Sequence, residues 1–208
     1  MVLGSYAFAE EVADLVGQAG VDELAGFVEN RDRDRCRGTL LGLPITWIDD
    51  AGPLAEYHSA VCAIGTNARR GFVEQAAAAG FRFTQVIHPS AVISPASELG
   101  EGCIAGPGVV VATTTRIGSH VILNRGVLVG HHTAIGDYVT ISPGANVAGK
   151  VTVGDGAYIG MGATVLDSRS VGAGAVVGAG SVVTHDVPAG VQVQGVPARV
   201  VKDGVEGR

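Results

Sequence analysis

The stretch VTISPGANVAGKVTVGDGAYIGMGATV, Val139 to Val165, places an aliphatic residue at every sixth position. The same register extends from Leu99 to Val183, and fourteen of its fifteen positions hold Leu, Ile or Val. These three residue types account for 54 of 208 residues, so about four of the fifteen are expected by chance. A six-residue period fits neither a helix nor a hairpin array, and it is typical of a β-solenoid in which each hexapeptide forms one side of a triangular coil.

The residues around each aliphatic position define the expected coil. Glycine follows the aliphatic residue at nine of the fifteen positions, and we expect it to supply a positive φ at the turn. The residue two places before is usually small or Val, which suits a position near the corner. Three hexapeptides would complete one coil, and successive coils would rise by about 4.8 Å. The pattern predicts a prism that packs its own core, without deciding its handedness.

Before His88 the sequence follows a different pattern, in which short apolar runs alternate with helical spacing. The order is βαβ-like and predicts a small, mostly parallel sheet flanked by helices. We therefore divide the chain into an α/β domain, residues 1–88, and a β-helix domain with a C-terminal tail, residues 89–208. The expected strands are Met1–Gly4, Glu23–Asn30, Leu43–Asp49, Ala60–Gly65 and Phe81–Ile87, and the expected helices are Phe8–Gly20 and Thr66–Gly80.

Charge and composition exclude several classes of protein. A net charge of -6, with only 14 Lys and Arg, argues against nucleic-acid binding. No run of 18 apolar residues marks a membrane span. Three distant cysteines without metal-type spacing predict free thiols and a cytoplasmic location. The mixed-charge run Glu29–Gly38 is interpreted as a solvated loop and not as a phosphate-binding patch, because its acids nearly cancel its arginines.

Several segments together resemble a known family. They are LGSYAFAEEV (Leu3–Val12), AIGTNARR (Ala63–Arg70), VIHPSAVISPAS (Val86–Ser97), the span Ile122–Val165, and GAGSVVTHDVPAG with GVPARVV (Gly178–Val201). With these the chain resembles the hexapeptide-repeat sugar O/N-acyltransferases of the sialic acid O-acetyltransferase type, including the bacterial nucleotide-4-aminosugar N-acetyltransferases. The resemblance implies a left-handed β-helix and a homotrimer with active sites between subunits. It also implies acetyl-CoA as cosubstrate, with no metal required.

The resemblance assigns His131 as the general base, a role that suits an imidazole near neutral pH. Because His131 lies two residues after the inward Val129, its side chain should project from the prism. His132 stands where the family usually carries an acid that orients the base. That role is left open between His132, Asp137 and a backbone carbonyl. Asn124 matches a polar family position near the reacting centre, with a solvated corner asparagine as the alternative.

A metal site is the competing interpretation of the histidines. Some hexapeptide solenoids bind zinc through three histidines, and this chain offers His120, His131 and His132. Adjacent residues of a strand point to opposite faces, so we expect that His131 and His132 do not share one ion. Thr140 stands where close relatives often have another histidine near the thioester, so the contacts to the acyl donor are expected to differ.

The resemblance also implies the binding residues. The backbone N–H of Gly149 would donate to the oxyanion. The pantetheine track would be lined by Met161, Gly178 and Ala179, and Arg199 would lie near a CoA phosphate. The repeat alone also explains the glycines among these residues. The implied nucleotide-sugar site comprises Gly4, Ser5, Tyr6, Glu29, Asn30, Gly65, Asn67 and Arg69. Only the first glycine of a GxGxxG turn is present, at Gly4. Helix capping by Thr66 or Asn67 is the alternative role for the second loop.

The resemblance implies an acetyl-CoA-dependent N-acetyltransferase that acts on the amine of a nucleotide-linked amino sugar. The expected partners are the nucleotide sugar, acetyl-CoA and further copies of the same chain. Two alternatives stay open on the sequence alone. One is O-acetylation of a sugar such as sialic acid, and the other is a catalytically weak nucleotide-sugar-binding protein.

Overall fold

The computed structural model describes residues 1–20 and 23–207. The chain separates into two compact units, Met1–Ile87 and His88–Arg208. Within the described ranges, no helix is both long and apolar enough to cross a membrane.

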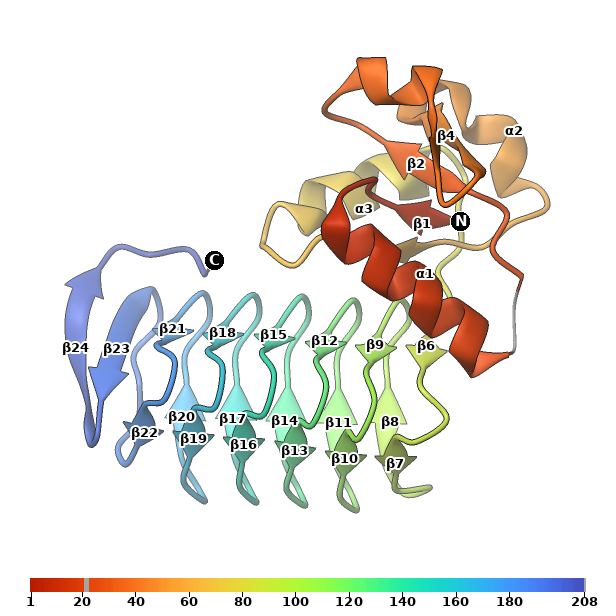
Figure 1. Ribbon diagram of the computed structural model, residues 1–208. Helices are drawn as coiled ribbons and strands as arrows, with labels where there is room; N and C mark the ends of the chain where they lie inside the picture. The colour runs from red at the N-terminus through yellow and green to blue at the C-terminus, as the bar shows by residue number, and fades with distance from the viewer. Residues whose placement is uncertain (21–22, 208) are drawn as a thin grey trace. The chain divides into compact units, whose positions relative to one another are not determined.

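The first unit is built on a five-stranded sheet with the order β3-β4-β2-β1-β5 (Figure 1). The central strand β1 pairs in parallel with β2 and β5, so that Val2 lies between Phe27 and Val61. Among the described strands of this sheet, only the edge pair β3–β4 is antiparallel. The prediction of a mostly parallel sheet is confirmed. The strands are β1 (Val2–Leu3), β2 (Phe27–Glu29), β3 (Thr39–Leu40), β4 (Leu43–Trp47) and β5 (Val61–Cys62), and β6 (Val86–Ile87) ends the unit.

The helices of this unit follow the predicted apolar spacing. Helix α1 (Ala7–Ala19) buries Val12, Leu15 and Val16. It ends at Gly20, whose φ of 66° lies in the left-handed region that glycine adopts without strain. The second long helix is α3 (Arg69–Ala78). Shorter turns are η1 (Arg33–Arg37), η2 (Ile48–Asp50) and α2 (Gly52–Ala55).

Several predicted boundaries are wrong. The strand expected over Glu23–Asn30 is limited to β2, and the last predicted strand is limited to β6. The N-cap of α3 is Ala68, because the carbonyls of Thr66 and Asn67 accept the first helical N–H groups in tight turns. The mixed-charge run is not a plain loop, since it starts on β2 and contains η1.

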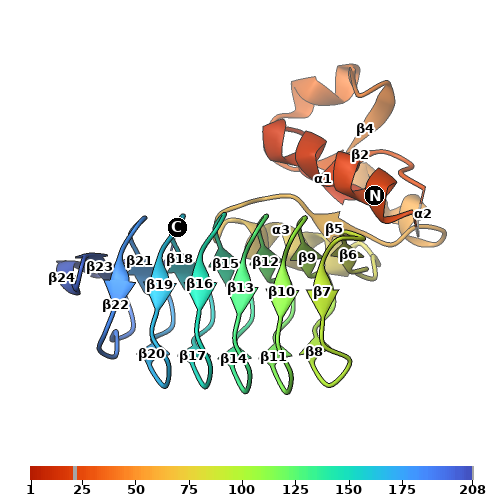
Figure 2. The same ribbon diagram turned by 60° about the horizontal axis from the view of Figure 1, so that its bottom comes forward.

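The second unit is a left-handed parallel β-helix whose coils consist of two-residue strands, as predicted, and it ends in the longer antiparallel pair β23–β24 (Figure 1). Val110 pairs with Leu128, so one coil takes 18 residues. We name its three sheets by their first strands within the unit. The β7 sheet contains β7, β10, β13, β16, β19 and β22, which lie side by side in Figure 2. The β8 sheet contains β8, β11, β14, β17 and β20, and the β9 sheet contains β9, β12, β15, β18, β21, β23 and β24.

Up to β22 the strand bounds follow the six-residue period, whereas β23 and β24 lie outside it. The β7-sheet strands are Val92–Ile93, Val110–Val111, Leu128–Val129, Asn146–Val147, Thr164–Val165 and Val182–Val183. The β8-sheet strands are Glu98–Leu99, Arg116–Ile117, Ala134–Ile135, Thr152–Val153 and Ser170–Val171. The β9-sheet strands are Ile104–Ala105, Ile122–Leu123, Thr140–Ile141, Tyr158–Ile159, Val176–Val177, Val191–Gly195 and Ala198–Asp203.

The core of the β-helix is made by two inward positions per hexapeptide. The periodic aliphatic residue is the second residue of its strand, as in Val147 and Val165, both 0% exposed. The small residue two places earlier is also buried, as in Ala145 and Ala163. Stacking these positions from coil to coil buries a continuous apolar core without help from a second layer.

The predicted reason for the repeated glycine is wrong. A glycine that follows the aliphatic residue, such as Gly130 or Gly154, does not have a positive φ. Instead, a Cβ on Gly154 would lie 2.5 Å from the Ala173 nitrogen of the next coil, so glycine is required by the close approach of the coils. The positive φ falls three residues after the aliphatic position, as in Gly126 (69°) and His132 (58°).

Candidate active site

His131 and His132 lie in the turn between β13 and β14, at the corner where the β7 sheet meets the β8 sheet. Both side chains are exposed, and their Nδ1 atoms are 3.0 Å apart. The rings meet edge to face, with centroids 5.2 Å apart. The prediction that the two side chains point to opposite faces is wrong, because they belong to a turn and not to a strand.

Gly149 lies at the same corner, one coil further along. The coils are joined there by a 2.8 Å hydrogen bond from the Lys150 N–H to the His131 carbonyl. A methyl group placed on Gly149 would lie 2.8 Å from His131 Nε2, so the imidazole rests against this glycine. No hydrogen bond among the described residues takes up the Gly149 N–H. The structure therefore brings together the predicted base and the predicted oxyanion donor.

Asp137 does not orient His131. It lies at the next corner, between β14 and β15, where its Oδ1 accepts a 2.7 Å hydrogen bond from the Ser119 N–H of the preceding coil. Its own N–H donates to Asp155 Oδ1 at 2.9 Å. This carboxylate links coils, which leaves His132 as the side chain that contacts His131 Nδ1.

Asn124 and Thr140 lie away from the two histidines. Asn124 is at the corner between β12 and β13, and its Nδ2 donates to the Ile141 carbonyl at 3.3 Å. Thr140 is buried on β15, in register with Ile122 and Tyr158. Across residues 1–20 and 23–207, no three His, Cys, Asp or Glu side chains are grouped in a way that could hold a metal ion.

Three residues assigned to the pantetheine track share one cavity. Met161, Gly178 and Ala179 line a space of about 410 Å³ at the C-terminal end of the β9 sheet, together with Gln194 and Lys202. Lys202 supplies a positive charge that the sequence analysis did not identify, because this residue follows the hexapeptide run. Arg199, on β24, is exposed, and its Nη1 donates to the Ala198 carbonyl at 2.9 Å.

In the first unit, the predicted sugar-binding loops meet at the carboxyl ends of β1, β2 and β5, where parallel sheets commonly bind ligands. Ser5 Oγ donates a 2.5 Å hydrogen bond to Glu29 Oε2. The other Glu29 oxygen accepts backbone N–H groups from Asn30, Arg31 and Asp32. Glu29 is only 2% exposed, so its carboxylate fixes the turn after β2 against the Ser5 loop.

Arg35 is a residue of this edge that the sequence analysis missed. Its Nε donates to Ser5 Oγ at 2.7 Å, and its Nη2 donates to the Ser5 carbonyl. The guanidinium carbon lies 4.3 Å from the centre of the Tyr6 ring, a cation–π distance. The alternation of charges in Glu29–Gly38 gave no signal that one arginine folds back over the Gly4–Tyr6 turn.

The loop after β5 contains Gly65, Asn67 and Arg69. The Arg69 side chain is 0% exposed, and its Nη1 lies 3.4 Å from the Thr66 carbonyl that accepts its hydrogen bond. Burial raises the pKa of the neighbouring Cys62 thiol to about 12, although the Arg69 charge opposes this shift. Gly65 and Asn67 are partly exposed, whereas Arg69 is buried and holds the loop through its hydrogen bond to the Thr66 carbonyl.

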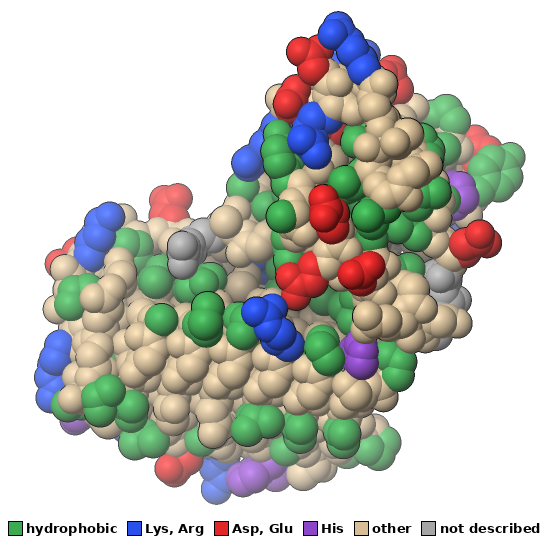
Figure 3. Space-filling model, viewed as in Figure 1, with side chains coloured by type: hydrophobic (Ala, Val, Ile, Leu, Met, Phe, Trp, Pro, Cys, Tyr) green, Lys and Arg blue, Asp and Glu red, His purple; other side chains and the backbone are tan. Residues whose placement is uncertain are grey.

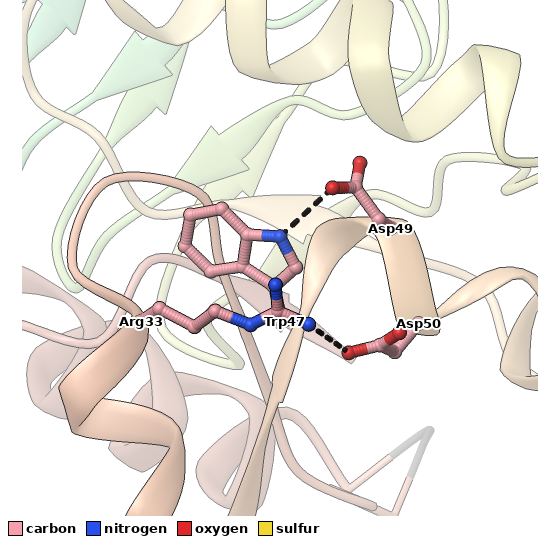
Figure 4. A network of polar contacts seen from close by, with 4 residues as sticks. All are labelled: Arg33, Trp47, Asp49 and Asp50. Carbon is pink, nitrogen blue, oxygen red and sulfur yellow. Dashed lines mark hydrogen bonds and ion pairs between the residues drawn. The ribbon is translucent and has the colours of Figure 1, made fainter.

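A second feature of the same edge surrounds Trp47, which ends β4 in register with Glu29. Trp47 Nε1 donates to Asp49 Oδ2 at 2.9 Å, and Arg33 pairs with Asp50 at 3.1 Å; Figure 4 draws both contacts. Arg33 lies 5.5 Å from the Trp47 ring centre. Arg33, Trp47 and Asp50 border a cavity of about 420 Å³, and an aromatic ring beside charged groups suits a planar polar ligand.

Comparison with known proteins agrees with this geometry. The family described as bacterial transferase hexapeptide (six repeats) matches residues 150–185. Perosamine N-acetyltransferase from Caulobacter crescentus, solved as a histidine-to-asparagine mutant with CoA and GDP-perosamine, has a TM-score of 0.89 and 33% identity, over 97% of this chain and 96% of that chain. The chain belongs to the hexapeptide-repeat sugar N-acetyltransferase family.

Two further solved structures match nearly the whole chain. The acetyltransferase domain of PglB from Neisseria gonorrhoeae has a TM-score of 0.86 and 32% identity, covering 96% of this chain and 98% of that chain. WeeI from Acinetobacter baumannii has a TM-score of 0.88 and 33% identity, with the same coverage of 96% and 98%. No curated protein sequence matches the chain significantly.

Proposed function

We propose that this protein transfers the acetyl group of acetyl-CoA to the amine of a nucleotide-linked amino sugar. The observation that carries the proposal is the corner at which His131 Nε2 lies against Gly149, whose N–H is available. A base and a backbone donor at one corner are what acyl transfer to an amine requires. Similarity over nearly the whole chain to a perosamine N-acetyltransferase bound to CoA and GDP-perosamine supports the substrate class.

In the proposed reaction, the amine nitrogen attacks the thioester carbonyl carbon while His131 Nε2 takes the proton that nitrogen loses. The Gly149 N–H donates to the oxyanion of the tetrahedral intermediate. The intermediate collapses as the carbon–sulfur bond breaks, and the proton from His131 neutralises the departing CoA thiolate. One amide bond forms, one thioester bond breaks, and the base returns to its starting state.

The cavity beside Met161, Gly178 and Ala179 is the proposed place for the pantetheine arm, with Lys202 available to a phosphate. It does not share a corner with His131. Met161 and Ala179 lie where the β9 sheet meets the β7 sheet, whereas His131 lies where the β7 sheet meets the β8 sheet. One copy therefore separates the base from the donor cavity, and a homotrimer with sites between subunits would bring them together.

The outer face of the β7 sheet supports association between copies. Its outward side chains include Val92, Val110 and Leu128, which are 63%, 39% and 42% exposed. Hydrophobic side chains form a row along the lower side of the β-helix in Figure 3. Such a face is unusual for a monomer and suits an interface between coils of neighbouring subunits.

The first unit is proposed to hold the nucleotide at the carboxyl edge of its sheet, between the Gly4–Tyr6 turn, the loop with Gly65 and Asn67, and the cavity beside Trp47. Arg35 supplies a cation at this edge, where the Gly-rich turn offers only one glycine. The protein is proposed to work in the cytoplasm, where acetyl-CoA and nucleotide sugars are available.

The test is acceptor-dependent release of CoA thiol from acetyl-CoA with GDP-, UDP- and dTDP-linked 4-amino sugars. The parent protein should release thiol with at least one of them, and His131→Ala should lower kcat by at least about a hundredfold. His185→Ala is the matched control, since His185 also lies on a turn and contacts a neighbouring side chain, Thr184. Equal loss in both variants, or no loss in His131→Ala, would count against the assignment.

A further inference from the structure

We propose that His132 is a positioning residue that accepts a hydrogen bond from His131 Nδ1–H and thereby keeps His131 Nε2 free to take the substrate proton. The inference rests on the proposed function of His131. It concerns the contact between His131 and His132. Without this contact, no other side chain among the described residues would orient the His131 ring.

The distance between the two Nδ1 atoms leaves two possible arrangements of the hydrogen between them. Two Nδ1 atoms 3.0 Å apart are at hydrogen-bond distance, so one of them carries the hydrogen and the other accepts it. A neutral imidazole has one N–H. If His131 donates, its Nε2 is an acceptor; if His132 donates, His131 carries its hydrogen on Nε2 and has no free site there for a proton.

Only the first arrangement persists through the reaction. When His131 has taken a proton on Nε2, it still holds the hydrogen on Nδ1 and still donates to His132, now as a charge-assisted hydrogen bond. In the reverse arrangement, the hydrogen bond between the rings must break before His131 can act. Nε2 is also the atom that rests against Gly149, so the first arrangement directs the free nitrogen toward the oxyanion donor.

The backbone supports this contact. His132 has a φ of 58°, and the turn is tied to its neighbours by hydrogen bonds from the His132 N–H to the Thr113 carbonyl and from the Lys150 N–H to the His131 carbonyl. The charged groups of the two coils packed directly on this corner are Arg116 and Lys150, and Asp167 and Arg169 follow one coil further along. They are common to the parent and to every variant below, so a change in pH profile reports on residue 132.

Three substitutions separate orientation from shape. His132→Ala removes the acceptor, whereas His132→Asp and His132→Asn restore a short polar side chain that tolerates the positive φ. Aspartate accepts with a negative charge and asparagine accepts without one. His185→Ala again serves as the control.

In the acetyl-transfer assay, His132→Ala should lower kcat at least about tenfold while the KM for acetyl-CoA changes less than about twofold. His132→Asp should restore kcat and move the acid limb of the kcat profile upward by about one pH unit, because a carboxylate stabilises the imidazolium. His132→Asn should restore kcat without that upward shift.

Nitrogen-15 NMR of the histidine rings gives a second measurement that needs no turnover. At a pH where both rings are neutral, His131 should carry its hydrogen on Nδ1 in the parent and lose this preference in His132→Ala. An unchanged tautomer, an unchanged kcat in His132→Ala, or coincident acid limbs for the aspartate and asparagine variants would overturn the inference. Loss of activity in His131→Ala alongside those results would leave the proposed function intact, whereas retained activity in His131→Ala would refute the function itself.

Discussion

The substitution Gly149→Ala tests whether the corner geometry matters for catalysis. The new Cβ would lie 2.8 Å from His131 Nε2, 2.9 Å from Cε1 and 3.2 Å from Cδ2. Gly149 does not have a positive φ, so alanine fits its backbone. The Gly149 N–H remains in place, and the substitution acts on the position of the imidazole alone.

The size of the effect follows from these contacts. Non-bonded carbon and nitrogen atoms prefer separations of about 3.5 Å or more, so the ring must move by roughly 0.5–1 Å. A misplacement of about 1 Å in a reacting group costs on the order of a hundredfold in rate, which corresponds to about 2.7 kcal/mol in the barrier. Because His131 is an exposed side chain that can yield, the free energy of unfolding should change by less than about 0.5 kcal/mol.

Initial rates of thiol release and a thermal unfolding scan measure the two effects separately. Gly130→Ala is the matched control, because a Cβ there would contact the Gly149 nitrogen and the Ala148 carbonyl carbon of the next coil, which belong to the backbone and cannot move aside. It should lower the melting temperature, whereas Gly149→Ala should lower kcat at an unchanged melting temperature. A Gly149→Ala enzyme with the parent kcat would refute the placement of the base.

Three other predictions concern binding, thiol chemistry and the core. Arg35→Ala should raise the KM for the nucleotide sugar about three- to tenfold, through loss of its contacts with Ser5, while steady-state assays show the KM for acetyl-CoA unchanged. Because burial raises the pKa of Cys62 to about 12 and keeps its thiol protonated at pH 8, a thiol reagent should label only Cys36 in the native protein and all three cysteines after unfolding. Val147→Ala should lower the free energy of unfolding by about 1–3 kcal/mol in denaturant titration, whereas Asn146→Ala, on the outer face of the same strand, should change it by less than about 0.5 kcal/mol.

The β-helix was predictable because its main determinant is local and repeated. Each hexapeptide places one aliphatic residue inward, and an uninterrupted period from Leu99 to Val183 leaves no other register for the coils. The function of the glycines was not predictable from the period. Whether Gly130 serves a positive φ or a close approach depends on the distance to the next coil, which the sequence does not contain.

In the candidate active site, too, one part was predictable from the repeat and another part depends on local three-dimensional geometry. His131 and Gly149 are one coil apart in the sequence, so their meeting at one corner follows from the 18-residue repeat. The contact between His131 and His132 depends on the turn geometry, and it was missed because a strand rule was applied to a corner. Arg35 and Lys202 were missed for a different reason, since each acts through a fold-back that no local motif marks.

The central claim is tested most directly by identifying the product. Incubation with acetyl-CoA and a GDP-linked 4-amino sugar, followed by mass spectrometry, should show a nucleotide sugar heavier by one acetyl group and carrying it as an amide. The same product should be nearly absent with His131→Ala. Formation of the product at the parent rate in that variant, or absence of any acetylated amine from the parent enzyme across the nucleotide-sugar panel, would contradict the account.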